Sequence, residues 1–514
     1  MKKKQNFLFI IADQLRADYL SCTGHPVVKT PYIDSIAARG TLFKRFYVAN
    51  PVCMPNRAAM MTGRHSSVSG VRHNGIPLPL EANTFVDVLR YGGYDTALIG
   101  KSHLQCTDEG EPELGPNPAA HEPLSDASRR VPGNYNQEKA SRWASKGASA
   151  MDLPYYGFSH VDLLTGHGDR GGGALLADQR AALDDPDSLW GAANQFPHDY
   201  TCPQAVRTRI PEEHYSTFWI RDRAKDYLAK STRHDSPFFA FVSFPDPHHP
   251  FTPPGKYWDM YDPDDMVLPE SFGKISANPP PHLKWLCEHG EPGKAAYGAA
   301  LVNEQQAREA MALTCGMISM IDDAVGAILT QLEASGLAEN TIVIFTSDHG
   351  DFLGDHGMIL KGPMHYQSTT RVPFIWAGSD NTAPTQTERL ASSVDIGPTI
   401  LNCAALKPFN GMQGRNLFES PPRHSVLIED DGNRISLGFE SAPRVRTLVT
   451  ERYRMSIYQG QSWGELYDLV EDPGEIENLW DEPKLFETRA SLQFELIQHL
   501  AHACDSSPWP ESLA

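Results

Sequence analysis

Four short apolar segments of this sequence end in side chains that could do chemistry. The segments are residues 7–12, 96–100, 238–244 and 341–346, and each has the length and composition of a strand buried on both faces. Ligands in open α/β sheets bind beyond the carboxyl ends of the strands. We therefore predict one site from the polar side chains at these ends, which are Asp13, Gln14, Lys101, Ser102, His103, His248, His249, Asp348 and His349.

Two carboxylates and an imidazole in this set suit a divalent metal ion. Asp13 and Asp348 offer oxygen, His349 offers nitrogen, and Gln14 adds an amide oxygen. Each residue also has an ordinary structural alternative, because carboxylates at strand ends often cap helices or form turns, and a histidine there can bond to the backbone. The presence of polar sets at four strand ends favours the metal site.

A further candidate, Cys53, lies in residues 51–65 (PVCMPNRAAMMTGRH). Arg57 follows it too closely for the phosphate-binding loop of a cysteine phosphatase, and no second cysteine stands at the spacing of a zinc site. Pro55 favours a turn and residues 58–61 favour a helix, which would place Cys53 at a helix N-terminus, where anions bind. The residues alone leave two interpretations open, an anion-binding thiol and a buried thiol under a turn.

Apolar residues at three- and four-residue spacing predict the helices that must position these strands. The expected helices cover residues 32–39, 82–91, 216–230 and 306–333. Strands that alternate with helices are typical of an α/β fold. We predict a large, mostly parallel sheet flanked by helices.

The pattern divides the chain into a catalytic α/β domain over residues 1–405 and a small α+β subdomain over residues 406–514. Within the first, residues 105–215 are rich in Gly, Pro, Asp and His, which predicts a loop-rich insertion near the mouth of the site that carries substrate selectivity. The second shows short alternating segments and a helix-like stretch at 484–503. This pattern predicts a C-terminal antiparallel sheet with a helix packed on it.

The composition of the 514 residues excludes some functions. The formal net charge of -19 argues against a nucleic-acid partner, because phosphate backbones bind clustered Lys and Arg. The eight cysteines lack paired spacing, which is typical of reduced thiols. The apolar run at 7–12 is too short for a signal peptide, and no stretch reaches the length of a membrane span. We expect a cytoplasmic enzyme with no membrane partner.

Residues 53–57 (CMPNR), followed by Thr62 and Gly63, match the signature C-x-P-x-R-x-x-x-x-T-G. On this motif the chain resembles the sulfatase family, in which the cysteine is oxidised to formylglycine after translation. The resemblance implies the fold of the alkaline phosphatase superfamily, a large α/β domain with a small C-terminal sheet domain. Further matches follow in the family's order at residues 13–14, 100–103, 248–250, 347–350, 361, 371–373, 395–399 and 465–469.

The resemblance implies a sulfuric ester hydrolase of the arylsulfatase type. In the mechanism that the resemblance implies, one hydroxyl of the hydrated formylglycine at residue 53 would attack sulfur. The other loses its proton to a base, assigned to His103, and expels sulfate as the aldehyde forms again. His248, together with Lys361, is assigned as the acid that protonates the leaving oxygen.

Other matched residues are expected to bind charge. Lys101, Lys361 and Asn74 would offset negative charge on the sulfate oxygens, and Arg57 would hold the diol and its loop in position. The expected cofactor is Ca2+ or Mn2+, and the partners are a formylglycine-generating enzyme during maturation and a small sulfate ester; a homo-oligomer fits the family. The metal ligands implied are Asp13, Gln14, residue 53, Asp348 and His349.

Two positions depart from the common sulfatase pattern. Gln14 stands where many sulfatases have a second Asp, and His349 where they have Asn, as in phosphonate monoester hydrolases, although that branch lacks Lys101 and His103. A phosphonate monoester hydrolase or phosphodiesterase is therefore the alternative from the same superfamily. The alternative from another class is a non-catalytic protein that binds an anion and keeps Cys53 as a thiol.

Overall fold

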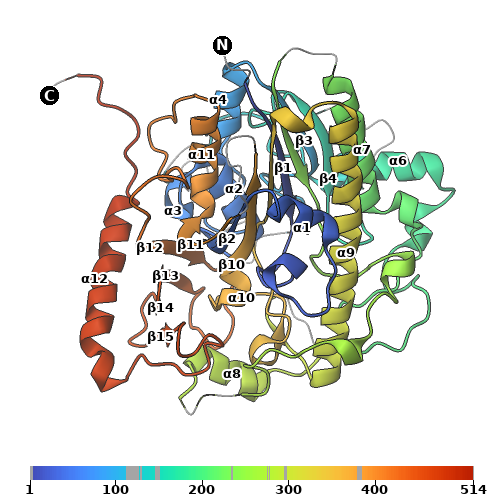
Figure 1. Ribbon diagram of the computed structural model, residues 1–514. Helices are drawn as coiled ribbons and strands as arrows, with labels where there is room; N and C mark the ends of the chain where they lie inside the picture. Colours follow the sequence, from blue (N-terminus) through green and yellow to red (C-terminus); the bar gives the residue numbers. More distant parts are fainter. Residues whose placement is uncertain are drawn as a thin grey trace.

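The computed structural model describes residues 4–110, 127, 130–144, 151–232, 236–274, 276, 278–293, 298–378 and 385–512. Nine strands within them form one large sheet (Figure 1). In spatial order the strands are β11 (Thr385–Ser392), β2 (Thr41–Tyr47), β10 (Arg371–Ala377), β8 (Thr341–Ser347), β1 (Asn6–Ala12), β6 (Phe238–Ser243), β3 (Asp95–Lys101), β4 (His160–Thr165) and β5 (Gly172–Gly173).

The four strands predicted from the sequence are neighbours at the centre of this sheet, in the order β8, β1, β6 and β3. All three contacts between them are parallel. Phe7 on β1 pairs with Phe239 on one side and Ile342 on the other, so the carboxyl ends of these strands meet at one edge. In the described sheet, β10 and β5 are the strands that pair antiparallel with their neighbours. The predicted mostly parallel sheet is confirmed.

Helices cover both faces of the sheet because both faces of its central strands are apolar. Leu8 and Ile10 of β1 belong to the core under the first set of helices, which are α1 (Pro31–Ala37), α7 (Ser216–Ser231) and α9 (Glu304–Ala334). Phe7 and Phe9 alternate with them and face the opposite set, which are α2 (Cys53–Thr62), α4 (Phe85–Tyr91) and α11 (Ile396–Cys403). This alternation holds the central strands between two apolar layers.

Helix α9 is almost entirely buried. Asn303 caps its N-terminus by accepting the N–H of Gln306, whose side chain accepts the N–H of Asn303 in return. The helix is long and apolar enough to cross a membrane, contrary to the expectation that no stretch reaches that length. However, 89% of its most apolar stretch is buried inside the protein, which makes it a core helix of the α/β layers.

A second, smaller sheet follows the large one in the chain. Its antiparallel strands are β12 (Ser425–Asp431), β13 (Arg444–Thr450), β14 (Tyr453–Tyr458) and β15 (Gly464–Asp468). Leu492 and Leu496 of α12 (Phe486–His502) pack on this sheet, and Figure 1 shows α12 along its outer side. The predicted antiparallel sheet with a helix packed on it is confirmed.

The segment expected to be a loop-rich insertion also contributes to the large sheet. β4 pairs with β3, and α6 (Ala174–Ala182) follows it. The first half of β4 is only partly buried and carries His160 and Asp162, so no apolar run marks this strand in the sequence. The other described elements are α3 (Ser66–Ser69), α5 (Ala140–Ala144), β7 (Ala300–Leu301), α8 (Pro281–His289), β9 (Met358–Ile359) and α10 (Gln367–Thr370).

Candidate active site

Cys53 is the first residue of α2 and its side chain is buried. Pro55 suits this position because proline is tolerated in the first turn of a helix. The helix N-terminus carries partial positive charge toward Cys53. Three groups surround its Sγ: Nε2 of His349 at 2.9 Å, Nζ of Lys361 at 3.5 Å and Oδ1 of Asp13 at 3.9 Å. The residue that the motif singled out therefore lies among the residues from the strand ends.

Asp13, Cys53, Asp348 and His349 form a group that could hold a metal ion. Their donor atoms lie within 4.8 Å of one another and all four side chains are buried. Nε2 of His349 is 3.5 Å from Oδ1 of Asp13 and 3.7 Å from Oδ1 of Asp348. Metal–ligand bonds of roughly 2.0–2.6 Å put neighbouring donors at about this separation, so the residues fit one ion.

Gln14 lies beside this group with a left-handed backbone, at φ 68°. Its backbone N–H donates to Oδ1 of Asp348 at 3.1 Å, and its Oε1 accepts from Nζ of Lys361 at 3.0 Å. Its Nε2 bonds to Asp351 and lies 3.1 Å from Nδ1 of His249. The amide oxygen is thus directed toward Lys361 at the edge of the metal-binding group.

Arg57 is completely buried, so it is not a surface charge. Its guanidinium donates to Oδ2 of Asp348 at 2.8 Å and to Oδ2 of Asp13 at 3.4 Å. It also donates to the carbonyl oxygen of Lys101 and to Oγ of Ser243, each at 3.0 Å. Arg57 therefore ties α2 to the ends of β1, β8, β3 and β6, and it neutralises charge on the two carboxylates.

Two lysines bring positive charge to the same place. Nζ of Lys361 is 3.2 Å from Nε2 of His248 and 3.1 Å from Nε2 of His349. Lys101, at the end of β3, forms a buried ion pair with Asp13. Nδ1 of His248 bonds to the carbonyl oxygen of the next residue, which leaves its Nε2 to face Lys361.

Asn74 reaches the N-terminus of α2 from a loop. Its Oδ1 accepts the backbone N–H of Met54, at 3.1 Å, immediately beside Cys53. This contact places the side chain amide of Asn74 at the helix end toward which an anion would be drawn.

The charges in this group shift two pKa values in the direction that favours anions. Burial alone would raise the pKa of Asp13, but the positive charge of Lys101, with smaller effects from His248 and Arg57, holds it well below its usual range. Burial and Asp13 would raise the pKa of Cys53, but Lys361, His349 and Lys101 outweigh them, so this pKa is lowered. The position of Cys53 is therefore electrostatically suited to a negatively charged oxygen or sulfur.

His103 lies just beyond β3 with a left-handed backbone, at φ 60°, and is 7% exposed. Burial, together with the charge of Lys101, holds its pKa well below the ordinary value. Its Nδ1 is buried without a hydrogen-bond partner among the described residues. A neutral imidazole of this kind can accept a proton.

His167 is a site residue that the sequence analysis missed. Its Nε2 bonds to Nζ of Lys101 and lies 3.7 Å from Oδ2 of Asp13, and its ring stacks on His248 with centroids 3.8 Å apart. The imidazole also meets the ring of His103 edge to face at 6.4 Å. His167 follows β4, so the strand-end rule would have found it had β4 been recognised in the sequence.

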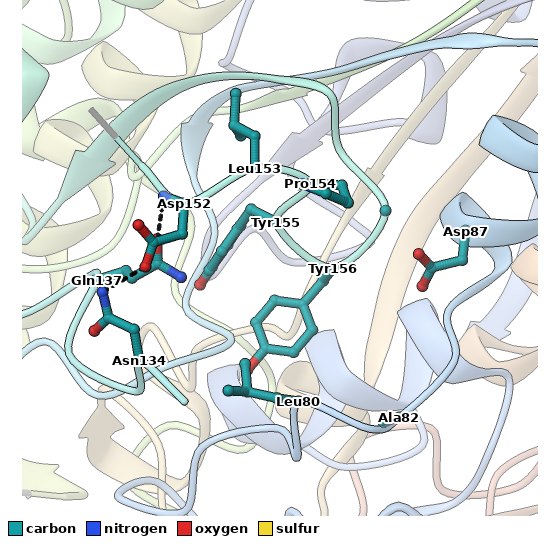
Figure 2. Close-up of a pocket in the computed structure, with 11 residues that line it drawn as sticks. Leu80, Ala82, Asp87, Asn134, Gln137, Asp152, Leu153, Pro154, Tyr155 and Tyr156 are labelled. Atoms are coloured by element: carbon teal, nitrogen blue, oxygen red, sulfur yellow. Dashed lines mark hydrogen bonds between the residues drawn. The ribbon is translucent and has the colours of Figure 1, made fainter. Parts of the chain in front are cut away.

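Two other histidines and a cavity lie apart from this group. His365 bonds to Oγ1 of Thr447 in the small sheet, and burial, together with the charge of Arg423, lowers the pKa of His65 to about 3. A cavity of about 320 Å³ is lined by residues of three loops and α4, and Figure 2 shows Tyr155 and Tyr156 in its wall. None of the residues that line it belongs to the metal-binding group.

A sequence model of the Sulfatase family matches residues 5–406 of the chain. The chain belongs to the sulfatase family. A second model, described as N-sulphoglucosamine sulphohydrolase, C-terminal, matches residues 354–502 of this sulfatase and spans the smaller sheet.

Known relatives of this sulfatase extend over nearly its whole length. The uncharacterized sulfatase YidJ of Escherichia coli (strain K12) is 27% identical over 500 residues, which cover 97% of this chain and 87% of the relative. An arylsulfatase of Clostridium perfringens (strain 13 / Type A) is 28% identical over 509 residues, which cover 97% and 94%. The crystal structure of the phosphonate monoester hydrolase of Agrobacterium radiobacter superposes with a TM-score of 0.75 and 25% identity, covering 98% of this chain and 96% of that one.

Proposed function

We propose that this sulfatase hydrolyses a sulfate monoester through a formylglycine made from Cys53, beside one divalent metal ion. Membership of the family supports sulfate ester hydrolysis. The observation that carries the finer proposal is the position of Cys53, at the N-terminus of α2 and in contact with both the metal-binding group and Lys361. The proposed ligands of the ion are Asp13, Gln14, residue 53, Asp348 and His349.

The formylglycine at residue 53 and the divalent ion would each supply specific chemistry. Hydrated formylglycine offers two hydroxyls on one carbon, one to attack sulfur and one whose deprotonation releases sulfate. A divalent ion at this group would make the attacking hydroxyl more acidic and offset charge on sulfate.

The residues of the chain bind and orient the sulfate. Negative charge gathers on the sulfate oxygens and on the leaving oxygen in the transition state, so fixed positive charge and N–H donors are needed there. Lys101 and Lys361 supply the charge, and Asn74 places an amide beside Cys53. Arg57 is held by five partners and fixes α2 and both carboxylates, so little reorganisation is required during the reaction.

Two proton transfers are assigned to opposite sides of the site. His103 is neutral and removes the proton of the second hydroxyl on residue 53. Lys361 donates a hydrogen bond to Nε2 of His248, and this pair delivers a proton to the leaving oxygen. The arrangement favours His248 and Lys361 acting together over either one alone.

The proposal also covers the maturation of Cys53 and the location of the protein in the cell. Conversion of Cys53 requires a formylglycine-generating enzyme as a transient partner. The eight cysteines lack the paired spacing of a disulfide framework, which supports our proposal that the protein works in the reducing cytoplasm.

The mass of the peptide that contains residue 53 tests the proposal most directly. We expect formylglycine in active protein, and we expect Cys53→Ala to retain the fold while losing nearly all turnover of an aryl sulfate. A fully active sample in which residue 53 is entirely thiol, or an active Cys53→Ala protein, would contradict the mechanism.

Hydrolysis of phosphonate monoesters or phosphodiesters is the second candidate. It is favoured by Gln14 and His349 and by the likeness to the Agrobacterium radiobacter enzyme. The values of kcat/KM for an aryl sulfate, a phosphonate monoester and a phosphodiester, measured on one preparation, separate the two. Because Lys101 and His103 are both present, we expect the aryl sulfate to have the highest value.

A further inference from the structure

A buried carboxylate binds the backbone of the loop that carries His103. Glu138 is 1% exposed, and its side chain accepts the backbone N–H of His103 at 2.8 Å, of Leu104 at 3.0 Å and of Gln105 at 2.9 Å. The hydroxyl of Tyr155 donates a fourth hydrogen bond to the same carboxylate. Glu138 therefore accepts from three successive backbone donors, of which the N–H of Leu104 has a second, longer contact with Oγ of Ser102 at 3.4 Å.

The backbone held in this way is in a disfavoured conformation. His103 has φ 60°, the left-handed region that side chains with a Cβ rarely adopt. Such a residue persists only where the surrounding structure determines it, and strained residues of this kind cluster at functional sites. The three N–H groups also have to be satisfied, because they are buried. Both demands are met by Glu138.

We propose that Glu138 is the positioning residue for the proton transfer at His103, because it holds the backbone from which that imidazole projects. This inference rests on the proposed function, in which His103 removes a proton from the hydroxyl of residue 53. His103 gains that proton and returns it to solvent, while Glu138 neither gains nor loses one. Glu138 acts through hydrogen bonds to the main chain and does not touch the substrate.

The wall of the cavity in Figure 2 forms the outer support of this arrangement. Tyr155 belongs to that wall and donates to Glu138, and Gln137, the residue before Glu138, accepts the N–H of Asp152 there. Hydrogen bonds thus run from the hydroxyl of Tyr155 through the carboxylate of Glu138 to the backbone N–H of His103. Loss of the Tyr155 hydroxyl should loosen the carboxylate without removing it.

The test compares Glu138→Gln with wild type in two measurements. Hydrogen exchange of the backbone over residues 102–106 should become faster, because an amide cannot accept three N–H groups as a carboxylate does. In a rapid-mixing assay, the first turnover of an aryl sulfate should remain fast, while later turnovers slow by about 100-fold, the effect of displacing a reacting group by about 1 Å. The enzyme should then carry one retained sulfuryl group by intact mass.

Asp322→Asn is the matched control. Asp322 is also 1% exposed and accepts two backbone N–H groups, of Tyr32 at 3.2 Å and Ile33 at 2.7 Å, between α9 and α1. The Asp322→Asn variant therefore loses a comparable buried carboxylate outside the candidate site. We expect this variant to change stability while keeping both the exchange at 102–106 and the ratio of first to later turnovers.

The outcomes separate this inference from the proposed function. If wild-type protein with converted residue 53 does not hydrolyse sulfate esters, the proposed function fails, whereas the exchange measurement still reports whether Glu138 holds the loop. If wild type is active and Glu138→Gln shows an unchanged ratio of turnovers, Glu138 is only structural. Should Glu138→Gln fail to fold, Tyr155→Phe carries the test: the same changes are expected at smaller size, and their absence overturns the inference.

Discussion

The candidate site has two halves that are built differently. In the metal half, Asp13 and Asp348 follow β1 and β8, which pair directly, Cys53 begins α2, and these three side chains are at most 2% exposed. In the other half, called the loop half here, His103 and His167 stand on loops beyond β3 and β4, and the side chain of His167 is 25% exposed.

The different construction of the two halves suits different tasks, holding the metal ion in one and selecting the substrate in the other. Adjacent strand ends and a buried arginine fix the metal half, so its donor atoms converge whatever the substrate. The loop half stands on loops over a rigid scaffold, which is where selectivity is commonly placed. We therefore expect changes in the metal half to abolish activity and changes in the loop half to alter individual steps.

The largest effect is expected from Asp348→Ala in the metal half. This change removes a proposed ligand and leaves Arg57 without its closest carboxylate partner. Metal bound per chain, measured by elemental analysis, should fall close to zero. Turnover should fall by about 10,000-fold, because a metal contributes several kcal/mol to stabilising the transition state. Asp322→Asn should keep both values, and full metal content in Asp348→Ala would show that the ligand set is wrong.

The strand-end residues of the metal half could be predicted because they lie beside the apolar runs that predict the strands. Asp13, Asp348 and His349 come just after strong apolar runs, and parallel pairing of those runs brings their ends together. Cys53 follows no such run and was found through its own motif. His103 and His248 were found by the same rule. His167 was missed because half-exposed β4 lacks such a run, and Glu138 because a side chain that accepts backbone N–H groups 35 residues away leaves no periodic signal. Asn74 was found only through resemblance to the family.

The next largest effect is expected from His103→Ala in the loop half. If His103 removes the proton from residue 53, the first turnover should proceed and later ones should be slowed by about 1000-fold, a typical contribution of a general base. A burst of phenol equal to the amount of enzyme, followed by slow release, is the expected trace. Uniform slowing of the first and later turnovers would assign the base to another residue.

A smaller effect that depends on the substrate is expected from His248→Ala. In the proposed mechanism the pair formed with Lys361 protonates the leaving oxygen, so the loss should be about 100-fold for the least acidic phenols and should shrink as the phenol becomes more acidic. The slope of log kcat/KM against phenol pKa should steepen. An equal loss across the series would leave Lys361 as the acid, without His248.

The smallest effect is expected at His167, where two substitutions separate two contacts. His167 accepts a hydrogen bond from Lys101 and also stacks on His248 at 3.8 Å. His167→Gln keeps an acceptor and loses the ring, whereas His167→Phe keeps the ring and loses the acceptor. A hydrogen bond to a charged group contributes about 1.5–3 kcal/mol, part of which the remaining ion pair with Asp13 replaces.

We therefore expect kcat/KM for an aryl sulfate to fall by about 10-fold in His167→Phe and by less in His167→Gln, if orientation of Lys101 is the main contribution. The reverse order would assign the contribution to the stack on His248. In that case His167→Gln should also steepen the dependence on phenol pKa, as His248→Ala does. Both variants should keep their bound metal, because His167 lies in the loop half, and metal loss in either would show that the two halves are not independent.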